Sequence, residues 1–185
     1  EEKQEERKKE EKTENLLLPK YTENSKQEMQ NIYNKDTKVA YLTFDDGPSK
    51  ENTARILDVL MERNIQATFF VVGENVEKYP DLIKRMVEEG HTIGIHCYSH
   101  SYDEIYSSTE DFIIDFERAK EAVLNIVDVE VWCYRFPGGS INTHNKNIYK
   151  EIIEEMSQRG YVYFDWNASM EDAVKKATKE QIIQK

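Results

Sequence analysis

Long hydrophobic runs are missing from this 185-residue sequence, which also contains only two cysteines, four prolines and seven glycines. No stretch reaches the roughly 18 apolar residues that a bilayer-spanning helix needs, so we expect no direct membrane insertion of this chain. The N-terminus also lacks the apolar core of a signal peptide. Two widely separated cysteines, Cys97 and Cys133, are too few for a disulfide framework. We expect two free thiols, with a Cys97–Cys133 bond as the alternative.

Basic residues are outnumbered. The 36 Asp and Glu residues exceed the 25 Lys and Arg residues, and the formal net charge is -11. This balance repels phosphate backbones, so it excludes nucleic acid as an expected partner. It also argues against electrostatic docking on an anionic membrane. The acidity is instead typical of a solvated protein surface.

Charged residues are densest at the N-terminus, where residues 1–15 are almost wholly charged or polar. Such a stretch has no apolar face with which to dock. We therefore interpret residues 1–36 as a charged, flexible linker and lead-in, and residues 37–185 as one domain, because the length has little room for two.

Strand-like and helix-like segments alternate through this domain. Short apolar runs predict strands at 39–44, 67–72, 92–96, 130–136 and 161–166. Helices are predicted at 51–63, from Pro80 to a closing Gly90, after a cap at Ser108 or Thr109, and at 146–159; a capping box at 178–181 would start another. This rhythm implies parallel strands joined by right-handed crossovers. The fold is then either an open parallel sheet or a barrel whose final units are absent.

Reactive side chains lie at the carboxyl ends of four of these strands, which is where parallel α/β folds form their active sites. They are Asp45 and Asp46, His96 followed by His100, Arg135, and Asp165 with Trp166.

Two histidines spaced as H-x-x-x-H can bind one metal ion with an aspartate as third ligand, which leaves a position for water. Alone, His96 and His100 could be ordinary surface residues, and Asp-Asp-Gly-Pro could be simple turn chemistry. Together at one rim they favour a metal site. Because neighbouring side chains of an extended strand diverge, one aspartate can bind the metal while the other acts as general base. Arg135 would orient that base, or merely form a strand-end salt bridge.

Four motifs in this order resemble those of the polysaccharide deacetylase family, which is carbohydrate esterase family 4, also called the NodB homology domain. They are TFDDGP at 43–48, HCYSH at 96–100, RFPGG at 135–139 and DW at 165–166. The resemblance covers about residues 37–185. It implies an α/β fold of the distorted (β/α) barrel type, with the C-terminal strands missing.

The resemblance also implies roles for individual residues. Asp45 would be the catalytic base, which Arg135 orients, and Asp46, His96 and His100 would be the metal ligands. In the substrate site, the Gly138 N–H would be an oxyanion donor, Asp165 the partner of a later histidine and Trp166 a wall of the acetate pocket, with Pro137 beside them. The implied ion is zinc, with cobalt, nickel or manganese as alternatives. The implied reaction is metal-dependent removal of N-acetyl groups from an N-acetylglucosamine polymer. Peptidoglycan is the expected polymer and a chitin-like oligomer the alternative, and the protein would be a monomer at the bacterial cell surface.

The sequence departs from the family pattern in four places. The family's acid is a histidine in a fifth motif, and no such motif precedes Lys185. A non-catalytic metal- and glycan-binding module is therefore the alternative, and a hydrolase of other C–N bonds is a third possibility. Cys97 stands where Ser or Thr is usual, and Ser101 where proline is common. Gly138 replaces a frequent aromatic residue, which suggests a more open substrate cleft.

Overall fold

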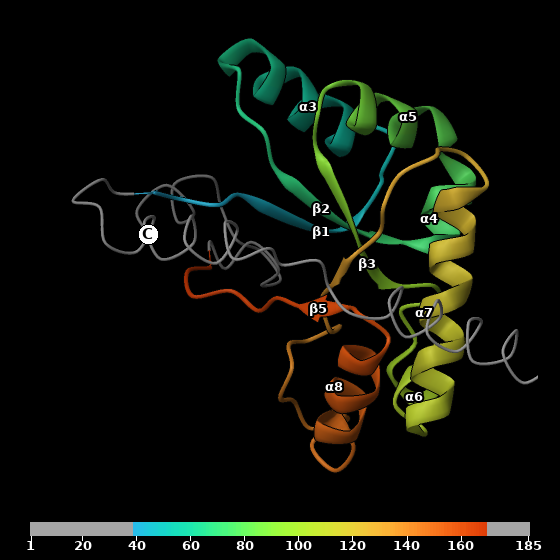
Figure 1. The fold of residues 1–185 in the computed structure, drawn as a ribbon. Coiled ribbons are helices and arrows are strands. Elements are labelled where there is room, and N and C mark those ends of the chain that lie inside the picture. The colour runs from blue at the N-terminus through green and yellow to red at the C-terminus, as the bar shows by residue number, and fades with distance from the viewer. Residues whose placement is uncertain (1–38, 170–185) are drawn as a thin grey trace, which may run out of the picture.

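One parallel sheet organises the described part of the chain. The structure is a computed structural model, and it describes residues 39–169. The sheet has the order β1-β2-β3-β4-β5, with each strand parallel to its neighbour (Figure 1). The strands are β1 (Thr43–Gly47), β2 (Thr68–Val72), β3 (Thr92–Cys97), β4 (Cys133–Tyr134) and β5 (Val162–Tyr163). Sequential order is typical of a (β/α) barrel, because a doubly wound sheet reverses its order between halves. The predicted parallel α/β architecture is confirmed, and within residues 39–169 the sheet is open.

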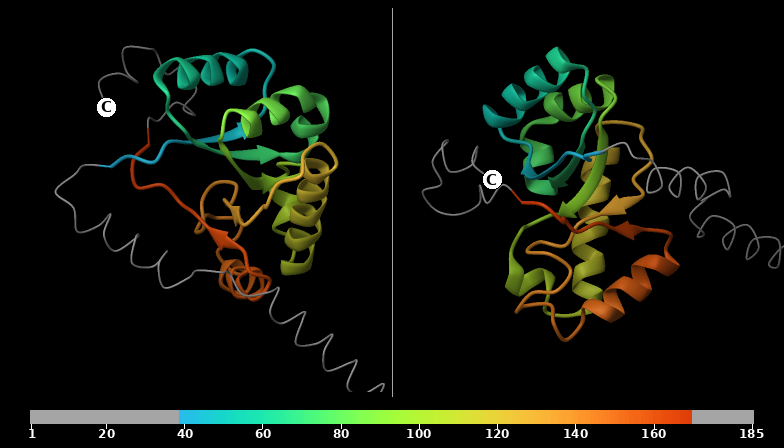
Figure 2. Two further views of the ribbon diagram at one scale, coloured as in Figure 1. Left: turned by 45° about the horizontal axis from the view of Figure 1, so that its top comes forward. Right: turned by 90° about the vertical axis from the view of Figure 1, so that its left-hand side faces the viewer.

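The helices follow one another in an arc around the strands. They are α3 (Asn52–Arg63), α4 (Gly73–Lys78), α5 (Pro80–Glu88), α6 (Tyr102–Ile105), α7 (Thr109–Leu124) and α8 (Tyr149–Gln158). Figure 1 shows α3 and α5 at the top, α4 and α7 at the side and α8 at the bottom, and the views of Figure 2 agree. Right-handed crossovers between sequential parallel strands produce this arrangement. Within residues 39–169, no helix is both long and apolar enough to cross a membrane.

The core lies between this arc and the sheet. Four consecutive residues of β2 are buried, which is typical of a parallel strand that is covered on both faces. Leu57 of α3 and Ile83 of α5 are fully buried against it. On the face of β2 away from these helices, the Arg135 guanidinium lies 4.2 Å from the ring centre of Phe70. The sheet therefore has a hydrophobic outer face and carries a buried cation on its inner face.

The capping residues recognised in the sequence predicted most helix ends correctly. Pro80 is the first residue of α5, and Gly90, just beyond that helix, has a φ of 80°. The Ser108 hydroxyl accepts a hydrogen bond from the Asp111 N–H at 3.0 Å and caps α7. Each of these residues acts on its own turn of chain, so the sequence alone could identify it.

The strands differ from their predicted bounds. The predicted strand 39–44 begins later, as β1, and continues into the two aspartates. Val39, Tyr41 and Leu42 are 54%, 72% and 42% exposed, and it is Phe44, stacked on Phe69, that joins this apolar run to the described core. The predicted strands 130–136 and 161–166 keep only two paired residues each, because the chain then turns out of the sheet. Arg135 and Asp165 therefore lie in the loops just beyond β4 and β5.

Two short helices were not predicted. Helix α4 starts directly after β2 and buries one apolar side chain, Val76, while α6 has only four residues. Neither is long enough to give a helical periodicity. The predicted linker 1–36 and the helix start at 178–181 lie outside the described residues, so the domain boundary after residue 36 stays a prediction.

Candidate metal centre and active site

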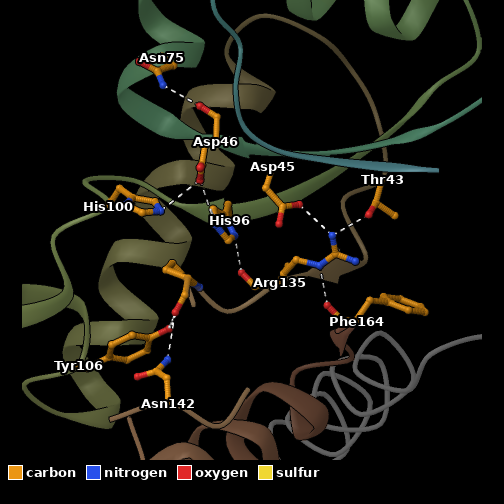
Figure 3. Close-up of polar contacts among 11 residues, drawn as sticks. Thr43, Asp45, Asp46, Asn75, His96, His100, Tyr106, Arg135, Asn142 and Phe164 are labelled. Atoms are coloured by element: carbon orange, nitrogen blue, oxygen red, sulfur yellow. Dashed lines mark hydrogen bonds and ion pairs between the residues drawn. The ribbon is translucent and has the colours of Figure 1, made fainter. Parts of the chain in front are cut away.

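Asp45 and Asp46 lie where β1 departs from regular pairing with β2. The register shifts between Phe44 and Gly47, as at a β-bulge. Asp46 has a φ of 66°, in the left-handed region that aspartate tolerates better than most residues. The two carboxylates diverge as predicted (Figure 3). The cause is different from the one expected, because the left-handed conformation of Asp46, and not a regular extended strand, separates them.

The Asp46 carboxylate meets two imidazoles. Its Oδ1 atom is 3.2 Å from Nε2 of His96, on β3, and 3.1 Å from Nε2 of His100, in the loop after β3 (Figure 3). One ligand atom from each of these residues lies within 4.8 Å of the others. The structure thus brings the three predicted metal ligands together.

A backbone contact orients His96 for metal binding. Its Nδ1 atom is 2.8 Å from the Arg135 carbonyl oxygen. A carbonyl oxygen can only accept, so Nδ1 carries the proton and donates it. When the ring is neutral, the lone pair of Nε2, on the side of Asp46 and His100, is then free to bind a metal ion. A metal-binding histidine commonly has this partner on its second nitrogen.

Charge at the triad also suits a cation. The hydrogen bonds with His100 and then with His96 hold the pKa of the Asp46 carboxyl well below its usual range. The same contact with Asp46 raises the pKa of His100. The nitrogen and oxygen atoms that form these hydrogen bonds are the atoms that would bind a divalent cation in place of the protons.

The donor set fits zinc. Zinc takes histidine nitrogen and carboxylate oxygen at about 2.0–2.2 Å in a tetrahedron, which places two ligands about 3.3 Å apart. The two observed N···O separations, 3.1 and 3.2 Å, are close to this value. His96 is buried and Asp46 is exposed, so the three ligands have one side open to solvent. Three protein ligands with an open side are typical of a catalytic zinc site.

The Arg135 side chain connects Asp45 to Thr43 and to the chain after β5. This side chain is only 3% exposed, and its Nη1 atom donates to Asp45 Oδ1 at 2.8 Å and to Thr43 Oγ1 at 2.7 Å. Its Nε atom donates to the Phe164 carbonyl oxygen at 2.8 Å, and Nη2 donates to the Asp165 carbonyl oxygen at 3.2 Å. Asp45 is therefore held as an ion pair beside the metal triad, as predicted for a base that Arg135 orients.

The segment after Arg135 makes a tight turn. The Gly139 N–H donates to the Phe136 carbonyl oxygen at 2.9 Å, and Gly138 has a φ of 76°. Proline second and a positive φ third are the pattern of a type II turn. Gly138 is exposed between the buried residues Pro137 and Gly139, and its N–H has no acceptor within residues 39–169. The predicted oxyanion donor is therefore accessible and free.

An aromatic ring from another element lies beside Gly138. A β-carbon at this position would lie 3.0 Å from the hydroxyl oxygen of Tyr102, on α6. The same tyrosine ring lies edge-on to His100, with ring centres 5.5 Å apart. The missing side chain at Gly138 therefore does not leave the metal site without an aromatic neighbour.

Asp165 and Trp166 lie against the same turn. The Asp165 carboxylate accepts from the Ser140 N–H at 3.0 Å and from the Ser140 hydroxyl. Trp166 is 47% exposed, and its ring would lie 3.4 Å from a β-carbon on Gly139. Both residues are thus near the predicted substrate site. Their roles toward a later histidine and an acetate pocket stay predictions.

The sequence interpretation missed several polar residues that support this site. Asn75 donates to the Asp46 carbonyl oxygen at 3.0 Å, while the Tyr106 hydroxyl and the Asn142 amide both donate to the Pro137 carbonyl oxygen (Figure 3). Asn75 and Tyr106 are remote in sequence from their partners, and Asn142 lies in a loop without a periodic pattern. Only Thr43, which binds Arg135, lies inside a motif that the sequence analysis quoted.

The remaining histidines and cysteines lie outside the triad. His91 is buried and accepts from the Ala67 N–H at 3.1 Å, which is a structural contact. His144 is on the surface, 4.9 Å from Tyr102 between ring centres. Cys97 and Cys133 are buried free thiols in this structure.

The chain is similar to known proteins. The family model described as polysaccharide deacetylase matches residues 32–164. A peptidoglycan-N-acetylglucosamine deacetylase of Bacillus cereus is 36% identical over 132 residues, which are 71% of this chain and 46% of the relative. A chitooligosaccharide deacetylase of Rhizobium leguminosarum bv. trifolii is 40% identical over 90 residues, covering 49% of this chain and 41% of the relative. The chain thus spans about half the length of these curated relatives or less.

A solved structure gives the same result for the fold. The catalytic domain of a peptidoglycan N-acetylglucosamine deacetylase from Eubacterium rectale has a TM-score of 0.73 and 36% identity. The match covers 83% of this chain and 74% of that domain. The predicted fold class, a distorted (β/α) barrel of this type, is confirmed.

Proposed function

Since the chain belongs to the polysaccharide deacetylase family, we propose that it uses a divalent metal ion to hydrolyse the N-acetyl groups of an N-acetylglucosamine polymer. One observation carries the proposal. A metal-ligand triad lies directly beside a second carboxylate, Asp45, which a buried arginine holds in place. A site for ion binding alone has no need for this second carboxylate.

Asp46, His96 and His100 would hold the ion. When bound, a divalent ion acts as a Lewis acid on a carbonyl oxygen and lowers the pKa of water. We propose zinc, because its ligand preference fits this donor set, with cobalt, nickel or manganese as alternatives.

The chain's own residues supply the proton and charge chemistry. Asp45 accepts a proton from the attacking water, and the ion pair with Arg135 holds its carboxylate in position. The Gly138 N–H donates to the amide oxygen as that oxygen gains charge. The C–N bond then breaks, acetate leaves with the water oxygen, and the amine leaves after it has taken up a proton. No described residue is assigned as the donor of that proton.

The proposed substrate is peptidoglycan, with a chitin-like oligomer as the alternative. The Bacillus and Eubacterium relatives named for peptidoglycan support the first, and the Rhizobium relative supports the second. We also propose that the protein acts as a monomer at the bacterial cell surface, where that polymer lies.

The test is acetate release from peptidoglycan and from N-acetylglucosamine oligomers, with metal-stripped and then zinc-loaded protein. Zinc-dependent release is expected. Asp45→Asn should lower kcat by about a hundredfold or more while zinc binding stays within a fewfold of wild type. Asp46→Asn should instead weaken zinc binding by at least about a hundredfold.

Bound zinc without acetate release from any of these substrates would contradict the proposal. It would favour a non-catalytic metal- and glycan-binding module. Release from other amides only would favour a related C–N hydrolase.

A further inference from the structure

The peptide between Pro137 and Gly138 receives hydrogen bonds from neighbouring side chains at its carbonyl oxygen only. The Pro137 carbonyl oxygen accepts from the Tyr106 hydroxyl at 2.8 Å and from the Asn142 amide at 3.1 Å. Among residues 39–169 the only cis bond is Gly47–Pro48, so this peptide is trans, and its N–H points away from its C=O. The carbonyl oxygen thus has two donors, while the N–H of Gly138, an exposed residue, has no acceptor within the described chain.

Both donors to this carbonyl are themselves held in place. Tyr106 is 7% exposed, and its ring stacks on Phe112 at 12° with ring centres 6.1 Å apart. Burial raises the pKa of its hydroxyl, so the hydroxyl stays protonated and donates. The Asn142 amide nitrogen also donates to Gly139 O at 3.1 Å, and its Oδ1 atom accepts from the His144 N–H at 2.8 Å.

The third residue of the turn, Gly138, favours the observed type II form but also permits the type I form. Type I and type II turns differ mainly by a rotation of about 180° of the central peptide, and glycine allows both. That rotation would place the Pro137 carbonyl oxygen where the Gly138 N–H now lies. An oxyanion at this position would then meet a lone pair and not a donor.

We propose that Tyr106 and Asn142 are positioning residues that lock the Pro137–Gly138 peptide in the orientation that presents the Gly138 N–H to the substrate oxygen. Tyr102 lies beside Gly138 and also beside His100, so this turn is next to the metal triad. The inference rests on the proposed function for its chemical meaning. The peptide orientation itself can be measured without turnover.

The kinetic test uses Tyr106→Phe and Asn142→Asp. The first removes one hydroxyl, and the second removes the amide donor while it keeps the Oδ1 acceptor. We expect each to lower kcat about tenfold, with KM within about twofold, because the N–H acts on charge that develops only in the transition state. Tyr161→Phe is the matched control. It removes a hydroxyl that accepts from Lys120 at 2.8 Å, remote from this turn, and should keep wild-type kcat.

The structural test uses the only Pro-Gly pair in the sequence. Carbonyl-¹³C proline with ¹⁵N glycine therefore gives a single correlation, for Pro137–Gly138, in an NMR spectrum of the full chain. Tyr106→Phe and Asn142→Asp should shift this signal or broaden it through exchange between two orientations. Tyr161→Phe should leave it unchanged.

An unchanged Pro-Gly signal in both variants overturns the inference, whatever the kinetics. So does a wild-type kcat in both variants when the wild type is active. If the wild type releases no acetate but the signal still shifts, the proposed function fails, and the lock on the peptide is retained. If Tyr106→Phe does not fold, as judged by circular dichroism, Asn142→Asp decides.

Discussion

Two adjacent residues of the same type have different partners in this site. Asp46 contacts two imidazoles and is 67% exposed at its side chain, whereas Asp45 contacts a guanidinium and is 29% exposed. The left-handed φ of Asp46 is what allows both contacts from neighbouring positions. Strained backbone of this kind costs of order 1–3 kcal/mol and tends to occur where function requires it.

Both thiols should be unreactive in the folded protein. Burial raises the pKa of each thiol, that of Cys133 to about 12, so almost no thiolate exists near pH 8. A water-soluble thiol reagent should modify neither residue in the native protein and both residues in concentrated urea, as measured by intact mass. Fast labelling of the native protein, or a mass that corresponds to a disulfide, would contradict this prediction.

At the scale of elements, the start of α7 shows how a local signal fixes a helix end. The Ser108 hydroxyl satisfies the Asp111 N–H, one of the unpaired donors of the first turn. Ser108→Ala should therefore lower the free energy of unfolding by about 1 kcal/mol, measured by urea denaturation. Ser157→Ala, at an exposed position of α8, is the control and should change it by less than about 0.5 kcal/mol. Equal effects of the two substitutions would contradict the capping role.

Arg135 joins elements that the sheet does not pair. Its guanidinium, just beyond β4, bonds to β1 through Thr43 and Asp45 and to the chain after β5 through Phe164 and Asp165. β1 and β5 stand at opposite ends of the strand order. The side chain therefore bridges the inner face of the sheet.

Arg135→Lys should destabilise the fold. Lysine cannot reproduce the forked donors and would leave buried acceptors unpaired, so we expect a loss of about 2–4 kcal/mol in the free energy of unfolding. Arg159→Lys is the matched control. Arg159 pairs with Glu155 on the surface, and its substitution should cost less than about 0.5 kcal/mol. Similar losses in urea denaturation would show that Arg135 is no more than a strand-end salt bridge.

At the scale of the whole molecule, the triad couples an edge strand to the centre of the sheet, since β1 supplies Asp46 and the β3 region supplies both histidines. A metal ion that binds only the folded chain must therefore stabilise it. Zinc at about 100 times its Kd should raise the free energy of unfolding by about 2.7 kcal/mol. Asp46→Asn should abolish this gain, while Asp103→Asn, which changes a 97% exposed carboxylate, should keep it.

The gain from zinc should also depend on pH in one direction. Histidine binds metal only in its neutral form, and its unperturbed pKa is about 6.5. The contact with Asp46 raises the pKa of His100 above this value, so the gain should be largest near pH 8, begin to fall above pH 6.5 and fall further below it as protons compete for the imidazoles. Thermal midpoints with and without zinc at each pH test this, and a gain that persists at pH 5 would contradict it.

What could be predicted from the sequence was what depends on nearby residues. The βα alternation, the Ser108 cap, the Pro80 start and the Gly90 stop each act within one turn or one strand. The types and order of Asp45, Asp46, His96, His100 and Arg135 indicated a metal site with a separate base, because parallel strands present their carboxyl ends at one rim. The structure brings these residues together there.

The tertiary structure alone decided what depends on distant contacts. The sequence does not show that Asp46 would take a left-handed conformation in a bulge, or that β4 and β5 would pair over two residues each. It could not reveal the hydrogen bond from Tyr106 to Pro137, because 31 positions separate these residues and neither lies in a periodic pattern with the other. Such contacts form only when packed elements bring remote chain segments to within hydrogen-bond distance. The Pro-Gly pair by itself favours the orientation of the Gly138 peptide, and the fold adds the two hydrogen bonds that hold it.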